Sequence, residues 1–233
     1  MKGSSPDLTY EVVRSQRETA DIIIERDGSV LVRAPEWAND DEIAKIVAAK
    51  QYWIYQGLAE WRDLNATRML REYKNGEAFL YLGRAFRLLL VAEQDAPLKL
   101  QGGRFTLRRD LAERGQTAAA KEAFRSFFVA RGLERIRQRV RYFAPKVGVS
   151  PSDLDVRELG HRWASCSATG ALAFHWKCMM APLTIIDYIV VHELCHILHR
   201  DHTDLFWNEV DKVLPDYRER KDWLRREGAG LDI

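Results

Sequence analysis

The sequence has few cysteines, no long apolar run and almost no net charge. Its three cysteines, Cys166, Cys178 and Cys195, form no C-x-x-C pair, so reduced, buried thiols are expected rather than a disulfide framework. No stretch approaches 18 consecutive apolar residues, and the first residues contain no apolar signal segment. These absences argue against export and against membrane spanning, and they favour a cytoplasmic protein.

The remaining composition is that of an ordinary globular protein. With 233 residues, of which 46% are hydrophobic, the chain can build the core of one large domain or two small ones. The 36 basic and 34 acidic residues leave a formal net charge of +2, which argues neither for nor against a nucleic-acid partner. Any basic surface must therefore be local.

The first part of the chain alternates strand-type and helix-type patterns. Two short apolar runs flank Asp27-Gly28, a dipeptide typical of a hairpin turn. Asn39 followed three residues later by Glu42 predicts a capped helix start, and the apolar spacing continues toward Leu64. One long helix with a single buried face is therefore expected after the first strands.

Strand character returns around Gly83, and a further hairpin is predicted at Gly102-Gly103. We therefore expect a β-rich N-terminal region over residues 1–112 that contains one long helix. Residues 113–233 would form a second region, and the two could form one compact unit. Helices and strands in separate runs of this kind predict the α+β class.

Apolar residues in 118–143 recur close to helical spacing and predict an amphipathic basic helix, which Gly132 could break or bend. Six arginines lie mostly between these apolar positions: Arg125, Arg131, Arg135, Arg137, Arg139 and Arg141. Such a row could bind phosphate or acidic protein. A solvated face that covers a core helix is the favoured interpretation.

A hairpin at Thr169-Gly170 and a capped helix start are predicted before the histidine-rich segment. Thr184 can act as the cap, Asp187 can reciprocate, and the helix would then continue through the apolar residues that follow. Four of the six histidines fall in VVHELCHILHRDH, residues 190–202. On a predominantly apolar helix, such polar groups require compensation.

The segment contains an H-E-x-x-H motif at residues 192–196. His192 and His196 are one turn apart, about 6 Å along the axis, so their imidazoles can converge on one zinc ion. Glu193 then lies beside the metal and is suited to act as a general base on a metal-bound water. Because the motif alone has a real false-positive rate, a third ligand is needed.

Both His199 and His202 are available as the third ligand. In a continuous helix His199 would lie about 10 Å along the axis from His192, which is too far for both to bind one ion. His202 can reach the ion only if the chain turns back around Arg200-Asp201. A third ligand at His202 therefore requires the helix to end near His199.

Three consecutive segments form a recognisable pattern: HELCH (192–196) with a further histidine six positions after His196, DLFW (204–207) and LPDYRERKDWLR (214–225). In these segments the sequence resembles the YgjP-like metallopeptidase family. That family is related to the SprT-like and WLM groups of zincins. RWASCS (162–167), LAFHWKCMMAP (172–182) and YLGRAFRL (81–88) are similar as well, so the resemblance covers nearly the whole chain. It implies a zincin-like fold for 113–233.

The resemblance implies a Zn²⁺ site made by His192, His196 and His202, with Glu193 as the catalytic base. Ala164 and His175 depart from the family pattern, where glycine and asparagine are expected. The spacing also matches the metzincin pattern, but a histidine at 199 replaces the glycine of that pattern, and no Met-turn follows.

Three further residues are weaker candidates for the site. His175, in the hairpin before the zinc helix, could polarise the scissile group or orient a ligand. Arg162 and Trp163 could contact substrate, although bracing the site is the favoured interpretation. His161 is interpreted as a surface or strand-end residue, and Cys195 is expected in the core because it points away from the histidine face.

Three functions are compatible with this pattern. A zinc metallopeptidase acting on peptide or protein is favoured, because three ligands, an open position and a base are what catalysis requires. The same centre could hydrolyse a non-peptide bond such as a nucleotide phosphoanhydride, with arginines binding phosphate. A binding module with structural zinc ranks last, and the SprT-like relatives leave DNA-associated proteolysis open.

Overall fold

The computed structural model describes residues 2–5, 8–24, 28–65, 71–113, 117–160 and 162–233, without the side chains of 2–5 and 60–65. The chain divides into two compact units, 1–68 and 69–233, whereas the sequence suggested a division after residue 112. In the described residues, no helix is both long and apolar enough to cross a membrane.

Where the structure describes the first unit, it is a four-stranded sheet with two helices. Its elements are β1 (Lys2–Ser5), β2 (Leu8–Ser15), β3 (Asp21–Ile24), β4 (Val30–Pro35), α1 (Asp40–Ala49) and α2 (Gln51–Asn65). The strand order is β1-β2-β4-β3, and only β2 and β4 are parallel neighbours. The antiparallel β3–β4 pair confirms the first predicted hairpin, although Asp27 itself lies outside the described residues.

The predicted helix start is confirmed and the predicted helix length is wrong. The Asn39 side chain accepts from the Glu42 N–H at 2.9 Å, and the Glu42 carboxylate accepts from the Asn39 N–H at 3.0 Å. The helix does not run unbroken to Leu64, because Lys50 separates α1 from α2. The Lys50 N–H is shared between two carbonyls, a bifurcated pattern common at helix ends.

The described residues of the second unit form two sheets and four α-helices. The first sheet contains β5 (Ala78–Tyr81), β6 (Arg84–Val91), β7 (Leu98–Gln101) and β8 (Arg104–Arg108), in the order β5-β6-β8-β7. The second contains β9 (Asp153–Arg157), β10 (Ala164–Cys166) and β11 (Ala171–His175), in the order β10-β11-β9. The antiparallel β7–β8 and β10–β11 pairs confirm the other two predicted hairpins.

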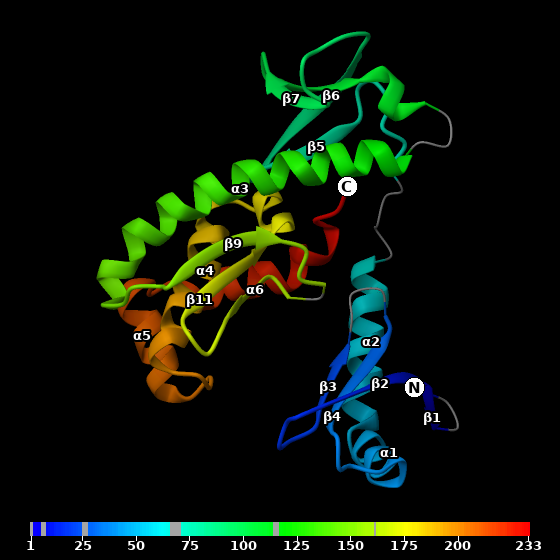
Figure 1. The fold of residues 1–233 in the computed structure, drawn as a ribbon, viewed down its shortest axis with the longest axis vertical. Coiled ribbons are helices and arrows are strands. Elements are labelled where there is room, and N and C mark those ends of the chain that lie inside the picture. Colours follow the sequence, from blue (N-terminus) through cyan, green and yellow to red (C-terminus); the bar gives the residue numbers. More distant parts are fainter. Residues whose placement is uncertain (1, 6–7, 25–27, 66–70, 114–116, 161) are drawn as a thin grey trace. The chain divides into compact units, whose positions relative to one another are not determined.

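The helices of this unit are α3 (Thr117–Val147), α4 (Leu183–Leu198), α5 (Asp204–Val213) and α6 (Tyr217–Glu227). Short 3₁₀ segments are η1 (Arg109–Ala112), η2 (Trp176–Met180) and η3 (Gly228–Gly230). Figure 1 shows α3 running between the β5–β7 strands and the layer formed by β9, β11 and α4. The chain is thus α+β, with a histidine-bearing helix in its second unit.

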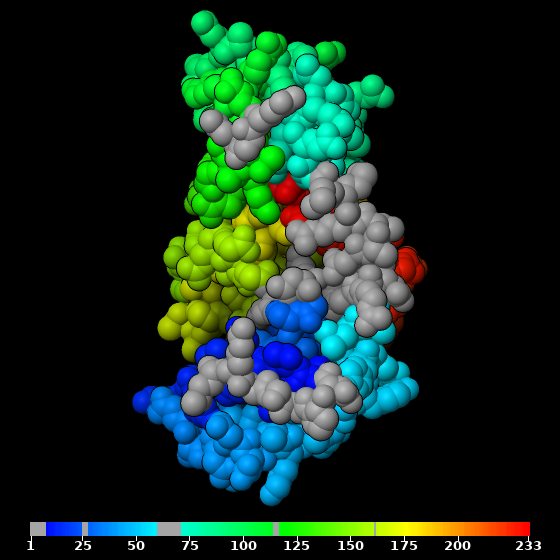
Figure 2. All heavy atoms as spheres, turned by 90° about the vertical axis from the view of Figure 1, so that its right-hand side faces the viewer, coloured from blue at the N-terminus to red at the C-terminus, as the bar shows by residue number. Residues whose placement is uncertain are grey.

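Aromatic packing explains why the strands after residue 77 belong to the second unit. Phe79 of β5 and Phe105 of β8 are fully buried, and their ring centroids lie 4.3 and 5.2 Å from that of Phe124 on α3. Buried rings in such arrangements dominate core energetics. In Figure 2 the teal and green atoms of this sheet and of the first turns of α3 form one continuous mass.

Gly132 does not break α3, which continues through it as one helix of 31 residues. The residue is buried, and a Cβ there would lie 3.1 Å from Val156 Cγ1 and 3.2 Å from Met179 Cγ. The missing side chain therefore lets the helix backbone approach β9 and η2 closely, which outweighs the low helix propensity of glycine.

The β5–β6 turn is fastened to the segment that leads into α4. The Leu82 N–H donates to the Met179 carbonyl at 2.7 Å, and the Gly83 N–H donates to the Met180 carbonyl at 3.1 Å. Gly83 has φ +76°, and a Cβ there would lie 2.9 Å from Cα of Pro182. Only glycine fits this contact, which positions the start of α4.

Gly83→Ala should lower the free energy of unfolding more than Gly103→Ala. Both glycines have positive φ, which costs alanine about 1–2 kcal/mol. Only Gly83 meets neighbouring backbone, so its variant should lose a further ~1–3 kcal/mol from overpacking, since the Gly103 position is open. Urea unfolding of the two variants measures the difference, and equal losses would contradict a tight contact with Pro182.

Candidate metal centre

The helix α4 is buried along most of its length and begins differently from the prediction. Its N-cap position is Pro182, and neither Thr184 nor another side chain caps it. Asp187 instead accepts two hydrogen bonds from the Arg139 guanidinium of α3, at 2.5 and 2.8 Å. The carboxylate expected to serve a local cap thus joins two helices as a bidentate ion pair.

Three histidines converge at the end of α4. His192 and His196 lie on the helix, and His202 lies in the loop before α5. The Nε2 atom of His192 is 3.2 Å from that of His196 and 3.0 Å from that of His202. No other group of His, Cys, Asp or Glu in the described ranges brings three such atoms together.

The loop bends where the sequence requires it. α4 ends at Leu198, and His199 is already extended, with φ −133° and ψ 115°. The Arg200 guanidinium donates to the Ala168 carbonyl at 2.6 Å and so holds the bend against the β10–β11 turn. The prediction that the helix ends near His199, so that His202 can fold back, is confirmed.

The three imidazoles fit a tetrahedral cation. Zinc–nitrogen bonds of about 2.1 Å imply nitrogen–nitrogen distances of roughly 3.4 Å, close to the two observed separations. The Nδ1 atom of His196 lies 3.0 Å from the His199 carbonyl, so it carries the proton and leaves the Nε2 lone pair free for a metal. His199 therefore contributes its backbone, and its ring is not part of the cluster.

Burial favours the neutral form that metal binding requires. Desolvation, with the nearby charges of His196, His202 and Lys221, lowers the pKa of His192 to about 3. Desolvation also lowers the pKa of His202. The Nδ1 atom of His192 is buried and has no hydrogen-bond partner among the described residues. Neutral imidazoles at physiological pH are ready to donate lone pairs.

Two aromatic residues of α5 line the histidines. The ring centroid of Phe206 lies 4.6 to 4.9 Å from those of His192, His196 and His202, and Phe206 is fully buried. Trp207 stacks on His202, with a centroid distance of 5.5 Å and an interplanar angle of 26°. This short helix thus packs against α4, and its contacts extend to the ring of His202.

Glu193 is buried next to this cluster without belonging to it. Burial raises its pKa to about 8, and the positive charge of Arg162 opposes that shift. Burial raises the pKa of the Cys166 thiol in β10, and the negative charge of Glu193 raises it further. Glu193 thus lies beside the histidines on α4, a helix that packs against β10, and the charge of Arg162 acts on its carboxylate.

His175 is hydrogen-bonded to Lys177 and Glu158, which lie outside the histidine cluster. Its Nδ1 accepts from the Lys177 N–H at 3.0 Å, so Nε2 carries the proton and donates to Glu158 Oε1 at 2.6 Å. Glu158 also accepts from Trp176 Nε1 at 2.8 Å. Burial opposes ionisation of Glu158, but these hydrogen bonds outweigh it and lower its pKa. Sequence reasoning missed Glu158, because no local pattern links residues 158 and 175.

The other weak candidates occupy different surroundings. Trp163 is half-buried, and a Cβ on Gly228 would lie 2.8 Å from its Cζ2 atom, so its ring packs on the C-terminal segment. Arg162 is exposed. Substrate contacts by these two residues, and a catalytic part for His175, stay predictions. His161 lies outside the described residues.

The cysteines behave as expected. All three are free thiols; Cys178 and Cys195 are buried and Cys166 is partly buried. Burial raises the pKa of Cys195 to about 12. Although Cys195 lies between the two helical histidines in sequence, it faces the core.

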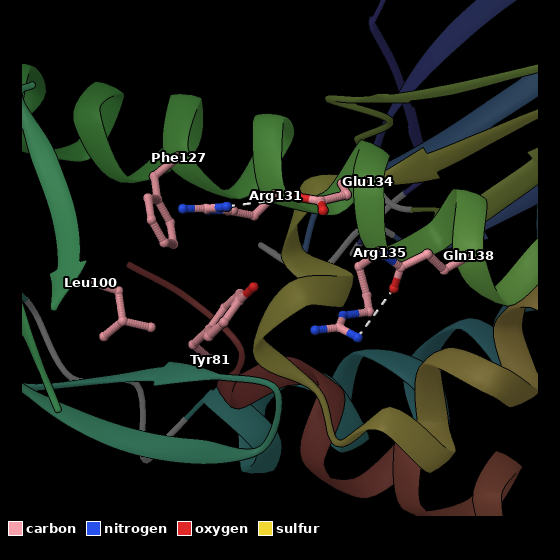
Figure 3. A pocket seen from close by; sticks show the side chains of 7 residues that line it. All are labelled: Tyr81, Leu100, Phe127, Arg131, Glu134, Arg135 and Gln138. Carbon is pink, nitrogen blue, oxygen red and sulfur yellow. Dashed lines mark hydrogen bonds and ion pairs between the residues drawn. The ribbon is translucent and has the colours of Figure 1, made fainter.

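The arginine row of α3 is not a uniform solvated face. A cavity of about 220 Å³ lies between α3 and the strands β5 and β7. Figure 3 shows the side chains that line it: Tyr81, Leu100, Phe127, Arg131, Glu134, Arg135 and Gln138. Arg125 pairs with Glu122, and Arg139 pairs with Asp187. Part of the row thus holds the fold together, and binding of phosphate or acidic protein by this helix stays a prediction.

Comparison with known proteins gave two findings. The sequence model of a family described as "YgjP-like, metallopeptidase domain" matches residues 18–227. A solved structure, described as the metallopeptidase zymogen of Pyrococcus abyssi abylysin, is 24% identical, with 37% of this chain and 89% of that chain covered and a TM-score of 0.35. A search of curated proteins found no significant match.

Proposed function

This chain belongs to the YgjP-like metallopeptidase family, and from that premise we propose that it is a zinc-dependent peptidase. His192, His196 and His202 would hold Zn²⁺, and Glu193 would act as the general base. The observation that supports this most strongly is the convergence of three Nε2 atoms beside a buried carboxylate. Three protein ligands with an open fourth position are typical of catalytic rather than structural zinc.

When bound, zinc would supply Lewis-acid activation of water, whose pKa it can lower to about 7. The chain's own contribution is the Glu193 carboxylate, which would take the proton of the attacking water on a side-chain oxygen and pass it to the leaving amine nitrogen. Burial raises the pKa of this carboxylate to about 8 and the charge of Arg162 opposes that rise; a bound cation would further favour the ionised form, which can accept a proton.

An extended peptide has a strand edge available to it. β10 pairs with β11 on one side, and in the described part of the chain no strand pairs with its other edge. β10 packs against α4, the helix that carries Glu193, so this strand runs near the base. We propose that substrate adds to β10 as a further strand, which supplies main-chain hydrogen bonds without requiring one particular sequence.

Zinc-loaded protein assayed against a peptide library and a nucleotide panel tests the proposal. We expect cleavage of peptide bonds, abolished by a chelator and restored by zinc, and no release of phosphate from nucleotides. Nucleotide hydrolysis without peptide cleavage would instead support the phosphoanhydride alternative. The absence of both activities in zinc-loaded protein would leave the binding-module alternative.

A further inference from the structure

A groove opens beside the candidate metal centre. Its volume is about 530 Å³, within the range of small-ligand sites. Side chains of α5 and α6 line it: Trp207, Tyr217, Arg218, Lys221, Asp222 and Arg225. None of these residues belongs to the histidine cluster or to the strand edge described above.

Stacked rings connect the groove to the metal centre. Trp207 stacks on Tyr217, with a centroid distance of 5.3 Å and an interplanar angle of 14°. The same Trp207 ring stacks on His202. A group that contacts Trp207 in the groove is therefore one aromatic ring away from a proposed metal ligand, which is where a substrate residue flanking the scissile bond would lie.

Three cations and one carboxylate line the groove, which makes it cationic. Arg218 lies 3.4 Å from Asp211, and Arg225 lies 3.2 Å from Asp222, so both have acidic partners. Lys221 differs from them. Its Nζ lies 4.3 Å from the centroid of the Trp207 ring, and within the described ranges no carboxylate lies at ion-pair distance from it.

We propose that this groove is a substrate subsite for a carboxylate, and that Lys221 determines its specificity. The apolar rings of Trp207 and Tyr217, which stack on each other, suit the hydrocarbon part of a residue, and the Lys221 ammonium group over Trp207 suits the negative end. The carboxylate could be the side chain of an acidic residue or the C-terminus of a peptide. That the groove binds part of a substrate rests on the proposed peptidase function. That it binds a carboxylate does not.

Binding can be measured without turnover in zinc-loaded Glu193→Gln protein. Isothermal titration would compare four otherwise identical peptides: Glu or Gln at one position, each with a free or an amidated C-terminus. We expect peptides with the recognised carboxylate to bind about fivefold more tightly than neutral peptides at low salt, as a solvent-accessible ion pair allows. Amidated Glu peptides and free-acid Gln peptides distinguish the two sources of the carboxylate.

The variant Lys221→Ala, built in the same background, should reduce this preference to near one, and Lys221→Glu should reverse it. Lys212→Ala is the matched control, because Lys212 is an exposed lysine of α5 that pairs with Glu209 and does not line the groove. Equal affinity for acidic and neutral peptides, or a preference that survives Lys221→Ala, would overturn the subsite.

The outcome separates this inference from the function on which it rests. If wild-type protein cleaves peptides without regard to carboxylates, the subsite fails and the peptidase function stands. If carboxylate-dependent binding requires Lys221 but no peptide is cleaved, the peptidase function fails and the binding site stands. A wild-type cleavage preference that shows in KM and is lost in Lys221→Ala would support both.

Discussion

Glu193→Gln is expected to retain zinc and to lose peptide cleavage, with kcat lowered by about 10²- to 10⁴-fold, the usual contribution of a general base. The glutamine is nearly the same size, so the histidine cluster should keep its geometry. A neutral amide cannot take the proton of the attacking water. The measurement is kcat on the best library peptide, together with zinc content by elemental analysis.

The control is Glu209→Gln, which removes a partly exposed carboxylate of α5 that pairs with Lys212. It should change kcat little, because that carboxylate is not part of the proposed site. Unchanged activity in Glu193→Gln would favour a structural zinc in a binding module. Loss of zinc from Glu193→Gln would show that the buried carboxylate helps to hold the metal rather than to move a proton.

His202→Ala is expected to weaken zinc binding by more than about 100-fold, because it removes a direct ligand, whereas loss of an outer-shell partner costs about 10- to 100-fold. His199→Ala is the matched control at the same bend. Its backbone carbonyl, which lies 3.0 Å from His196 Nδ1, remains in place, so zinc affinity should change little. Competition titration against a chromogenic chelator measures both affinities.

The two alanine variants therefore test the choice of third ligand directly. Similar losses in His199→Ala and His202→Ala would contradict it, as would normal zinc affinity in His202→Ala. Thermal unfolding gives a second readout, since zinc that binds only the folded chain raises Tm. That rise should be present for wild type and His199→Ala and absent for the double variant His192→Ala with His196→Ala.

Local patterns predicted the elements of this protein better than their grouping. The spacing of Asn39 and Glu42 predicted a capping box that is present, since both partners lie within one turn. The cap at Thr184 was wrong, because Asp187 forms an ion pair with Arg139, 48 residues away in sequence. A tertiary ion pair thus replaced the local hydrogen bond that the sequence offered.

The domain division shows the same limit. Strands before and after the first helices have similar patterns, and nothing in their sequence assigns them to different units. The strands of 78–108 belong with α3 because Phe79 and Phe105 pack on Phe124, a contact that depends on three-dimensional proximity.

The sequence by itself determined that His192 and His196 share one helical face with Glu193 beside them, because the 3.6-residue period dictates those directions. It also showed that His202 could join them only if the helix ended near His199. Only the tertiary structure decided the rest: the bend that Arg200 holds, the pairing of His175 with Glu158, and the stacking of Trp207 that brings Lys221 close to the histidines. These contacts join segments separated by many residues, and such contacts depend on how whole elements pack rather than on the period of any one of them.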